Sequence, residues 1–160
     1  MTRRSFLIAP ALVFGAAVTS MAQRQRALNA VDATPTLVDV YKDPGCGCCS
    51  SWAEHLKAAG FNVKVTEKAD LAAFKTAHGV PAQARSCHTA LVGGYVLEGH
   101  VPAADVLKLL KDKPAVVGLA VPGMPVGSPG MEVKGMKAAA YDVVSFDKQG
   151  ATKVVASYNR

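Results

Sequence analysis

Three cysteines within four residues constrain this chain more than any other feature. Cys46, Cys48 and Cys49 directly follow an Asp-Pro-Gly turn at 43–45, which ends an alternating stretch over 36–41. The alternation predicts a strand, and the apolar residues after Cys49 recur at helical spacing. The cluster is therefore expected at a junction where a strand ends and a helix begins.

The following residues continue to alternate between strand and helix patterns. The predicted strands are 36–41, 61–66, 88–92 and 95–98, and the predicted helices start at Cys49, Asp70 and Pro102. Gly93-Gly94 is the dipeptide expected of a two-residue hairpin turn between the last two strands. The resulting order, β-α-β-α-β-β-α, predicts an α/β fold of the thioredoxin-like class. Such proteins keep their redox cysteines at the first strand-to-helix junction.

The C-terminal third has a different character. Residues 114–136 are rich in Gly, Pro and Met, and they form a stretch too long and irregular for an ordinary connector. After it, 141–146 and 152–158 alternate as two strands around a polar turn. We expect a Gly/Pro/Met-rich loop and a C-terminal β-hairpin that complete a single metal-binding domain over 36–160.

The N-terminal residues have the layout of a secretory signal. Arg3 and Arg4 precede an apolar run that starts at Phe6, and Ser-Met-Ala at 20–22 suggests cleavage before Gln23. The stretch resembles the twin-arginine export signature, which we favour over the Sec route. The apolar run of about 13 residues is short of the roughly 20 that a spanning helix needs, which disfavours an uncleaved anchor. We therefore predict a signal peptide over 1–22, a flexible tail over 23–35 and a periplasmic mature chain.

Charge and hydropathy exclude two classes of partner. The formal net charge of +6 falls to +4 when Arg3 and Arg4 leave with the signal, and the other basic residues are scattered along the chain. A nucleic-acid-binding protein would concentrate them in a patch. The composition contains no second long apolar run, so we expect no membrane span in the mature chain and no nucleic acid as partner.

The spacing of the cysteines limits which pairs form disulfides. Adjacent Cα atoms are about 3.8 Å apart, which is below the usual disulfide span and would strain a Cys48–Cys49 bond. Cys46 and Cys49 instead form a C-x-x-C pair at a helix start, where thiol pKa values fall. These two residues are the candidates for an attacking and a resolving thiol in a thiol-disulfide oxidoreductase.

A metal site is the other interpretation of the cluster. Thiolates are soft ligands that suit Cu(I), and a thioredoxin-like fold brings the loop containing Cys87 against the start of the first helix. Four crowded sulfurs favour copper over zinc, whose knuckles usually show two separate C-x-x-C pairs. A third interpretation is a pair of structural disulfides, Cys46–Cys49 and Cys48–Cys87, because the chain has an even number of cysteines. The residues alone leave these alternatives open.

Histidine and methionine side chains are candidates for a supporting role. His88 and His100 are candidates next to the site, although a strand residue after an inward-pointing Cys87 should point away. Met124 and Met131 are candidates for soft thioether ligands or a copper relay, and Met136 is a weaker one.

Two residues of the first helix have ordinary structural interpretations. Trp52 has the spacing of a core residue. His55 lies six residues beyond Cys49, roughly 9 Å along a helix, and is expected at the surface and not at the metal.

Four motifs in the same order resemble the CopG-like periplasmic copper-resistance proteins, a family long described only as a domain of unknown function. The motifs are YKDPGCGCC at 41–49 with Trp52 and His55, SCHTA at 86–90, EGHVP at 98–102 and GLAVPGMP at 118–125. The resemblance implies a thioredoxin-like fold with a multinuclear Cu(I)-thiolate cluster on Cys46, Cys48, Cys49 and Cys87. It also implies a role in copper resistance or Cu(I)/Cu(II) conversion. Copper ions are the expected ligand, and a periplasmic copper donor or an efflux component is the candidate partner.

Overall fold

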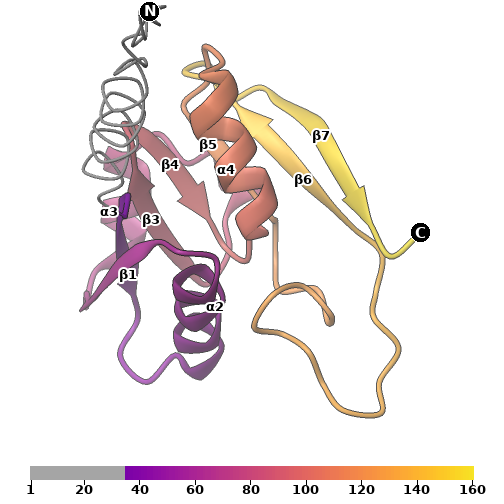
Figure 1. The fold of residues 1–160 in the computed structure, drawn as a ribbon. Helices are drawn as coiled ribbons and strands as arrows, with labels where there is room; N and C mark the ends of the chain where they lie inside the picture. Colours follow the sequence, from indigo (N-terminus) through magenta and orange to yellow (C-terminus); the bar gives the residue numbers. More distant parts are fainter. Residues whose placement is uncertain (1–34) are drawn as a thin grey trace, which may run out of the picture. The chain divides into compact units, whose positions relative to one another are not determined.

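The computed structural model describes residues 35–160, whose strands join in one seven-stranded sheet (Figure 1). In sheet order the strands are β2 (Asn62–Glu67), β1 (Leu37–Lys42), β3 (His88–Val92), β4 (Tyr95–Glu98), β5 (Gly118–Ala120), β6 (Tyr141–Phe146) and β7 (Thr152–Tyr158). The predicted signal peptide over 1–22 and all but the last residue of the predicted tail over 23–35 lie outside the described residues.

Strand β1 lies near one end of the sheet and precedes the cysteine cluster. Val38 and Val40 are fully buried in β1, and the alternation that predicted the strand is the cause of this one-sided burial. β1 pairs with β2 in parallel and with β3 antiparallel. Helix α2 (Gly47–Ala58) connects β1 to β2, and it starts after the short turn that follows β1.

The helices lie on both faces of the sheet (Figure 1). Helix α3 (Leu71–Ala77) and the short 3-10 helix η1 (Ala82–Ala84) connect β2 to β3, and α4 (Ala103–Asp112) follows β4. On one face α2 and α4 share a core with alternate residues of β1, β3 and β4. Phe74 of α3 packs on Tyr41, which points to the opposite face from Val40. The α/β class predicted from the sequence is confirmed.

Trp52 is the largest fully buried side chain in the described part of the chain. It belongs to the core that α2 and α4 share, and its indole Nε1 donates a hydrogen bond to the carbonyl oxygen of Val101 at 2.8 Å. The core assignment made from helical spacing is therefore confirmed.

Strand β5 was not predicted from the sequence. Its three residues lie inside the Gly/Pro/Met-rich segment, where a short run carries no periodic signal. β5 pairs in parallel with β4 and antiparallel with β6, so it joins the C-terminal hairpin to the sheet. Strands β6 and β7 span the residues predicted for that hairpin.

No helix within residues 35–160 combines the length and the apolar character that crossing a membrane requires. Helix α2 is the longest of the described helices, with 12 residues, and its solvent-facing side carries Glu54 and Lys57 as an exposed ion pair.

Candidate metal centre

Helix α2 begins inside the cysteine cluster. Cys46 is its N-cap residue, and Cys48 and Cys49 lie in the first turn. No side chain caps the helix at Cys46, and the first N–H groups of a helix carry a partial positive charge. The cysteine cluster therefore lies at the positive end of α2.

Two of the three clustered cysteines form a disulfide. Cys46 and Cys49 are bonded, with their Cα atoms 5.5 Å apart, and Cys48 Sγ lies 3.6 Å from Cys46 Sγ. Cys48 and Cys87 are free thiols. The interpretation with two structural disulfides required a bond between Cys48 and Cys87, and the structure does not contain it.

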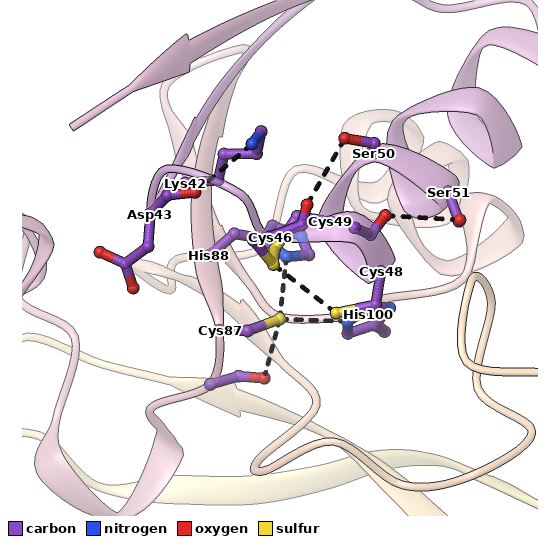
Figure 2. Close-up of a disulfide and its surroundings, with 12 residues drawn as sticks. Lys42, Asp43, Cys46, Cys48, Cys49, Ser50, Ser51, Cys87, His88 and His100 are labelled. Atoms are coloured by element: carbon purple, nitrogen blue, oxygen red, sulfur yellow. Dashed lines mark hydrogen bonds between the residues drawn. A yellow bond between two sulfur atoms is a disulfide. The ribbon is translucent and has the colours of Figure 1, made fainter.

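Cys87 brings the fourth sulfur to the cluster. It lies directly before β3, and its sulfur faces the start of α2 (Figure 2). The sulfur atoms of Cys46, Cys48, Cys49 and Cys87 all lie within 4.8 Å of one another. The hydroxyl groups of Ser50 and Ser51 point away from them and bond to backbone oxygens of the previous turn. The four cysteines named as candidate ligands therefore converge in one place.

Two imidazoles extend this group of sulfurs. Cys87 Sγ lies 3.3 Å from His88 Nδ1 and 3.1 Å from His100 Nε2. The ligand atoms of these three residues also lie within 4.8 Å of one another. The expectation that His88 points away from Cys87 is wrong, because Cys87 precedes the strand and the alternation of strand side chains does not apply to it.

The orientation of each imidazole is set by its surroundings. The Nδ1 of His100 lies 2.7 Å from the carbonyl oxygen of Pro129, which can only accept a hydrogen bond. The hydrogen is therefore on Nδ1, and the lone pair of Nε2 faces Cys87. Metal-binding histidines commonly show this arrangement, in which the second nitrogen donates to a carbonyl. The His88 ring packs on Trp52 with 4.3 Å between ring centres, and its Nε2 is buried without a hydrogen-bond partner in the described residues.

Burial also sets the protonation of the group. It raises the pKa of the Cys87 thiol to about 11, and the neighbouring Cys48 adds to this effect. Burial lowers the pKa of His100, and it lowers the pKa of His88 well below its usual value, with the nearby His100 and Lys75 acting in the same direction. Both imidazoles are therefore neutral near pH 7 and able to donate a lone pair, whereas Cys87 keeps its proton until a cation replaces it.

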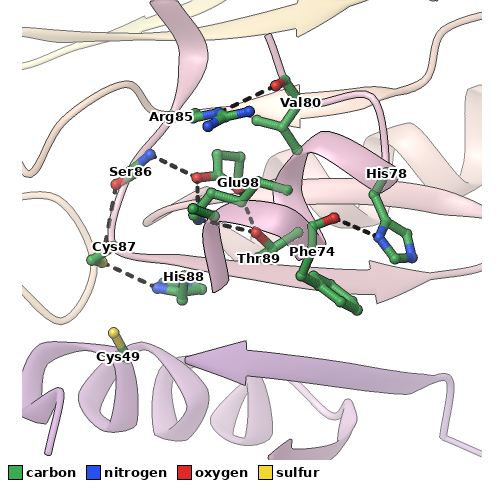
Figure 3. Close-up of polar contacts among 12 residues, drawn as sticks. Cys49, Phe74, His78, Val80, Arg85, Ser86, Cys87, His88, Thr89 and Glu98 are labelled. Carbon is green, nitrogen blue, oxygen red and sulfur yellow. Dashed lines mark hydrogen bonds and ion pairs between the residues drawn. The ribbon is translucent and has the colours of Figure 1, made fainter. Parts of the chain in front are cut away.

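Residues behind Cys87 form a buried polar network that was not found from the sequence. Glu98 is fully buried, and it accepts a hydrogen bond from the backbone N–H of Ser86 at 2.6 Å (Figure 3). Lys75 Nζ donates a second hydrogen bond to Glu98 at 2.5 Å. Burial raises the pKa of Glu98, and its bonded neighbours oppose that rise. The only signal for this network in the sequence was an acidic residue in a strand that is otherwise apolar.

The candidate methionines differ in exposure. Met124 is 55% exposed, Met136 is 59% exposed, and Met131 is half-buried in the loop between β5 and β6. The proposed thioether or relay role of Met124 and Met131 stays a prediction. Met131 follows Gly130, which packs against the first turns of α2.

His55 differs from the surface position expected for it. It is half-buried, and its Nε2 accepts a hydrogen bond from the backbone N–H of Ala103 at 3.1 Å. Burial lowers the pKa of His55, and the neutral ring satisfies one of the free N–H groups at the start of α4. His55 therefore links α2 to the start of α4, at Ala103, which lies shortly after His100 in the chain.

Replacing Gly130 with alanine should destabilise the chain and disturb the site. Gly130 has a φ of +82°, and a Cβ atom there would lie 2.6 Å from the backbone nitrogen of Trp52 and 3.1 Å from the Cys48 carbonyl oxygen. We expect a loss of about 1–3 kcal/mol in the free energy of unfolding beyond the backbone strain alone, measured by chemical denaturation.

Gly135→Ala is the matched control for this prediction. Gly135 has a φ of +84°, but no atom lies within 4 Å of the position that its Cβ would take. The control carries the backbone strain of about 1–2 kcal/mol without the close contact. Equal losses in the two variants would show that the loop does not pack on α2 as described.

Comparison with known proteins gives two kinds of match. Residues 84–131 match the family described as "Protein of unknown function, DUF411". A solved structure of copper resistance protein copG, form 2, is 49% identical, with a TM-score of 0.73 over 78% of this chain and 98% of the other. Form 1 is 48% identical, with a TM-score of 0.74 over 79% and 99%. No curated protein matches the chain.

Proposed function

This chain belongs to the CopG-like copper resistance family, and on that premise we propose that it is a periplasmic protein that binds Cu(I) through Cys46, Cys48, Cys49 and Cys87. The proposal includes export by the signal at 1–22. It also includes a thioredoxin-like fold, supported by the order β1-α2-β2-α3-β3-β4-α4. Copper is the cargo of the protein, which holds it for resistance or homeostasis.

The convergence of four sulfurs is the observation that supports this function best. Sulfur is the ligand that Cu(I) prefers, and thiolate ligands distinguish it from harder ions. The sulfur atoms lie so close together, within 4.8 Å, that each one can bridge neighbouring ions, so we propose a multinuclear cluster. His88 and His100 supply neutral nitrogen donors beside Cys87. The chemistry of this donor set fits copper.

The disulfide makes copper binding depend on the oxidation state of the protein. While Cys46 and Cys49 are bonded to each other, neither sulfur is a thiolate, and only Cys48 and Cys87 remain as thiol ligands. Reduction by two electrons releases both sulfurs for the metal. Conversion between Cu(I) and Cu(II) at this site, and exchange of copper with a periplasmic donor or an efflux component, belong to the same proposal.

The disulfide also favours a second candidate function, a thiol-disulfide oxidoreductase. Cys46 is partly exposed and Cys49 is buried, so an external thiolate reaches Cys46 more easily. In this alternative Cys46 is the attacking thiol in the reduced protein and Cys49 resolves the mixed disulfide.

Metal analysis of the reduced chain separates the two functions. We expect more than one Cu(I) per chain after anaerobic reduction, removal of the reductant and loading with Cu(I). Prior oxidation to the Cys46–Cys49 disulfide should lower this number, because two of the four sulfurs are then unavailable. A chain that retains no copper in either state but reduces a model disulfide would contradict the copper function and support the oxidoreductase.

A further inference from the structure

We infer that Glu98 and Lys75 are positioning residues for the metal site, and that the Glu98 carboxylate holds Cys87 opposite the cysteine cluster through the backbone N–H of Ser86. This inference rests on the proposed copper function, because it assigns how one ligand of that site is held. Neither residue reaches the copper ligands itself.

Glu98 lies in a closed set of hydrogen bonds with Lys75 and Thr89. Lys75 Nζ donates to Glu98 Oε1 and, at 3.0 Å, to Thr89 Oγ1. Thr89 Oγ1 donates in turn to Glu98 Oε2 at 2.7 Å. Glu98 is fully buried and Lys75 is 6% exposed, so both charges have lost most of their hydration. The hydrogen bond from the Ser86 N–H to Glu98 connects this closed set of hydrogen bonds to the loop before β3.

Stability alone does not account for a buried ion pair such as Lys75 and Glu98. The cost of removing two charges from water often exceeds their attraction, and apolar residues of similar volume are frequently as stable. Such pairs have a more specific effect when they fix one conformation. Here the charged acceptor fixes the backbone position of Ser86, the residue before Cys87.

Ser86 is held from more than one side. Its hydroxyl donates to the carbonyl oxygen of Gly123, and the two residues form an isolated parallel bridge. Gly99 approaches Ser86 so closely that a Cβ atom on Gly99 would lie 2.4 Å from Ser86 Oγ. The segment Glu98-Gly99-His100 thus supplies an acceptor for Ser86, space for its side chain and an imidazole for Cys87 (Figures 2 and 3).

Two variants without the charge pair separate positioning from general stability. Lys75→Met/Glu98→Gln removes both charges but retains an amide oxygen that accepts from Ser86, while the amide nitrogen can donate to Thr89. Lys75→Met/Thr89→Val/Glu98→Leu removes the acceptor as well and leaves no buried charge or hydroxyl without a partner. Both variants lack the charge pair, and they differ in the acceptor for the Ser86 N–H and in the Thr89 hydroxyl that bonds to it.

Cu(I) affinity is the first measurement, made by competition with a chromophoric Cu(I) chelator. We expect the triple variant to bind Cu(I) about 10–100-fold more weakly than the wild-type chain, the usual loss when a residue that orients a metal ligand is removed. The double variant should stay close to wild type. Equal affinities of the two folded variants would overturn the inference.

Glu67→Gln is the control for disturbing another buried lysine. Lys42 is 6% exposed and pairs with Glu67 at 3.1 Å. In the described residues its ammonium group donates to Glu67 and to the Asp43 carbonyl oxygen, and not to the network around Ser86. We expect the copper affinity of the Glu67→Gln chain to stay at the wild-type value. A loss as large as that of the triple variant would mean that any broken ion pair weakens the site, which would also overturn the inference.

A measurement on the copper-free wild-type chain keeps the inference testable if a variant does not fold or if no copper binds. The Ser86 amide should exchange with deuterium at least about tenfold more slowly than a solvent-exposed amide, because its acceptor is a buried carboxylate. Unprotected exchange at Ser86 would overturn the positioning role. Absence of copper binding with a protected Ser86 amide would contradict the proposed function alone.

Discussion

Cys87→Ser is expected to weaken Cu(I) binding by at least about 100-fold, because even the loss of a residue that only orients a metal ligand costs about 10–100-fold. Cys87 is the residue shared by both donor groups, the four sulfurs and the sulfur with two imidazoles. Serine retains the size of the side chain and replaces the soft ligand with a hard one. Chelator competition with the reduced chain measures the affinity, and metal analysis measures the number of ions.

The control for Cys87→Ser is Ser50→Ala. Ser50 is exposed on α2, and within residues 35–160 its hydroxyl bonds only to the Cys46 carbonyl oxygen, at 3.5 Å. We expect wild-type affinity and copper number from this control. Unchanged copper binding in Cys87→Ser would show that the three clustered cysteines form the site without the remote sulfur, and the four-sulfur proposal would then be wrong.

The strand that precedes the cluster and the start of α2 could be predicted because their signals are local. β1 alternates, an Asp-Pro-Gly turn follows it, and the apolar residues of α2 recur at helical spacing. The hairpin β6–β7 has the same kind of signal. β5 could not be predicted, because its three residues form a strand only by pairing with β4 and β6, which lie at distant positions in the sequence.

The candidate metal ligands could be predicted only in part, because local spacing brings some of them together and the fold brings the others. The sulfurs of Cys46, Cys48 and Cys49 are close because of their spacing, and Cys87 could be added only by assuming a fold. The position of His88 depends on where β3 starts, within one residue, and boundaries are the least certain part of a prediction from sequence. The network of Lys75, Thr89 and Glu98 comes from three separate elements, so no local pattern predicts it.

Trp52→Ala is expected to have the largest effect on stability, a loss of about 3–5 kcal/mol in the free energy of unfolding. Trp52 is fully buried, and its removal leaves a cavity between α2, α4 and the sheet. It also leaves the Val101 carbonyl oxygen without the indole donor. Trp52 is the only tryptophan in the chain, so unfolding of the variant must be followed by circular dichroism and not by tryptophan fluorescence.

A second variant at Trp52 separates the hydrogen bond from the packing, and a variant at an exposed position serves as the control. Trp52→Phe keeps most of the buried ring and removes the donor to Val101, so we expect about 1–3 kcal/mol from the unsatisfied carbonyl. Leu107→Ala, at a position that is 51% exposed on α4, should change stability by no more than about 0.5 kcal/mol. If Trp52→Ala cost no more than Leu107→Ala, the packing of α2 described here would be wrong.

Trp52 also connects the hydrophobic core to the metal site. The His88 ring packs on Trp52, and Val101, which accepts from the indole, directly follows His100. Without the indole both imidazoles gain freedom to turn away from Cys87, and part of the copper affinity should be lost even in molecules that remain folded. Copper affinity should therefore fall in Trp52→Phe as well, whereas the control Leu107→Ala should retain the wild-type affinity. A Trp52→Phe chain with full affinity would show that the packing on Trp52 does not hold the imidazoles.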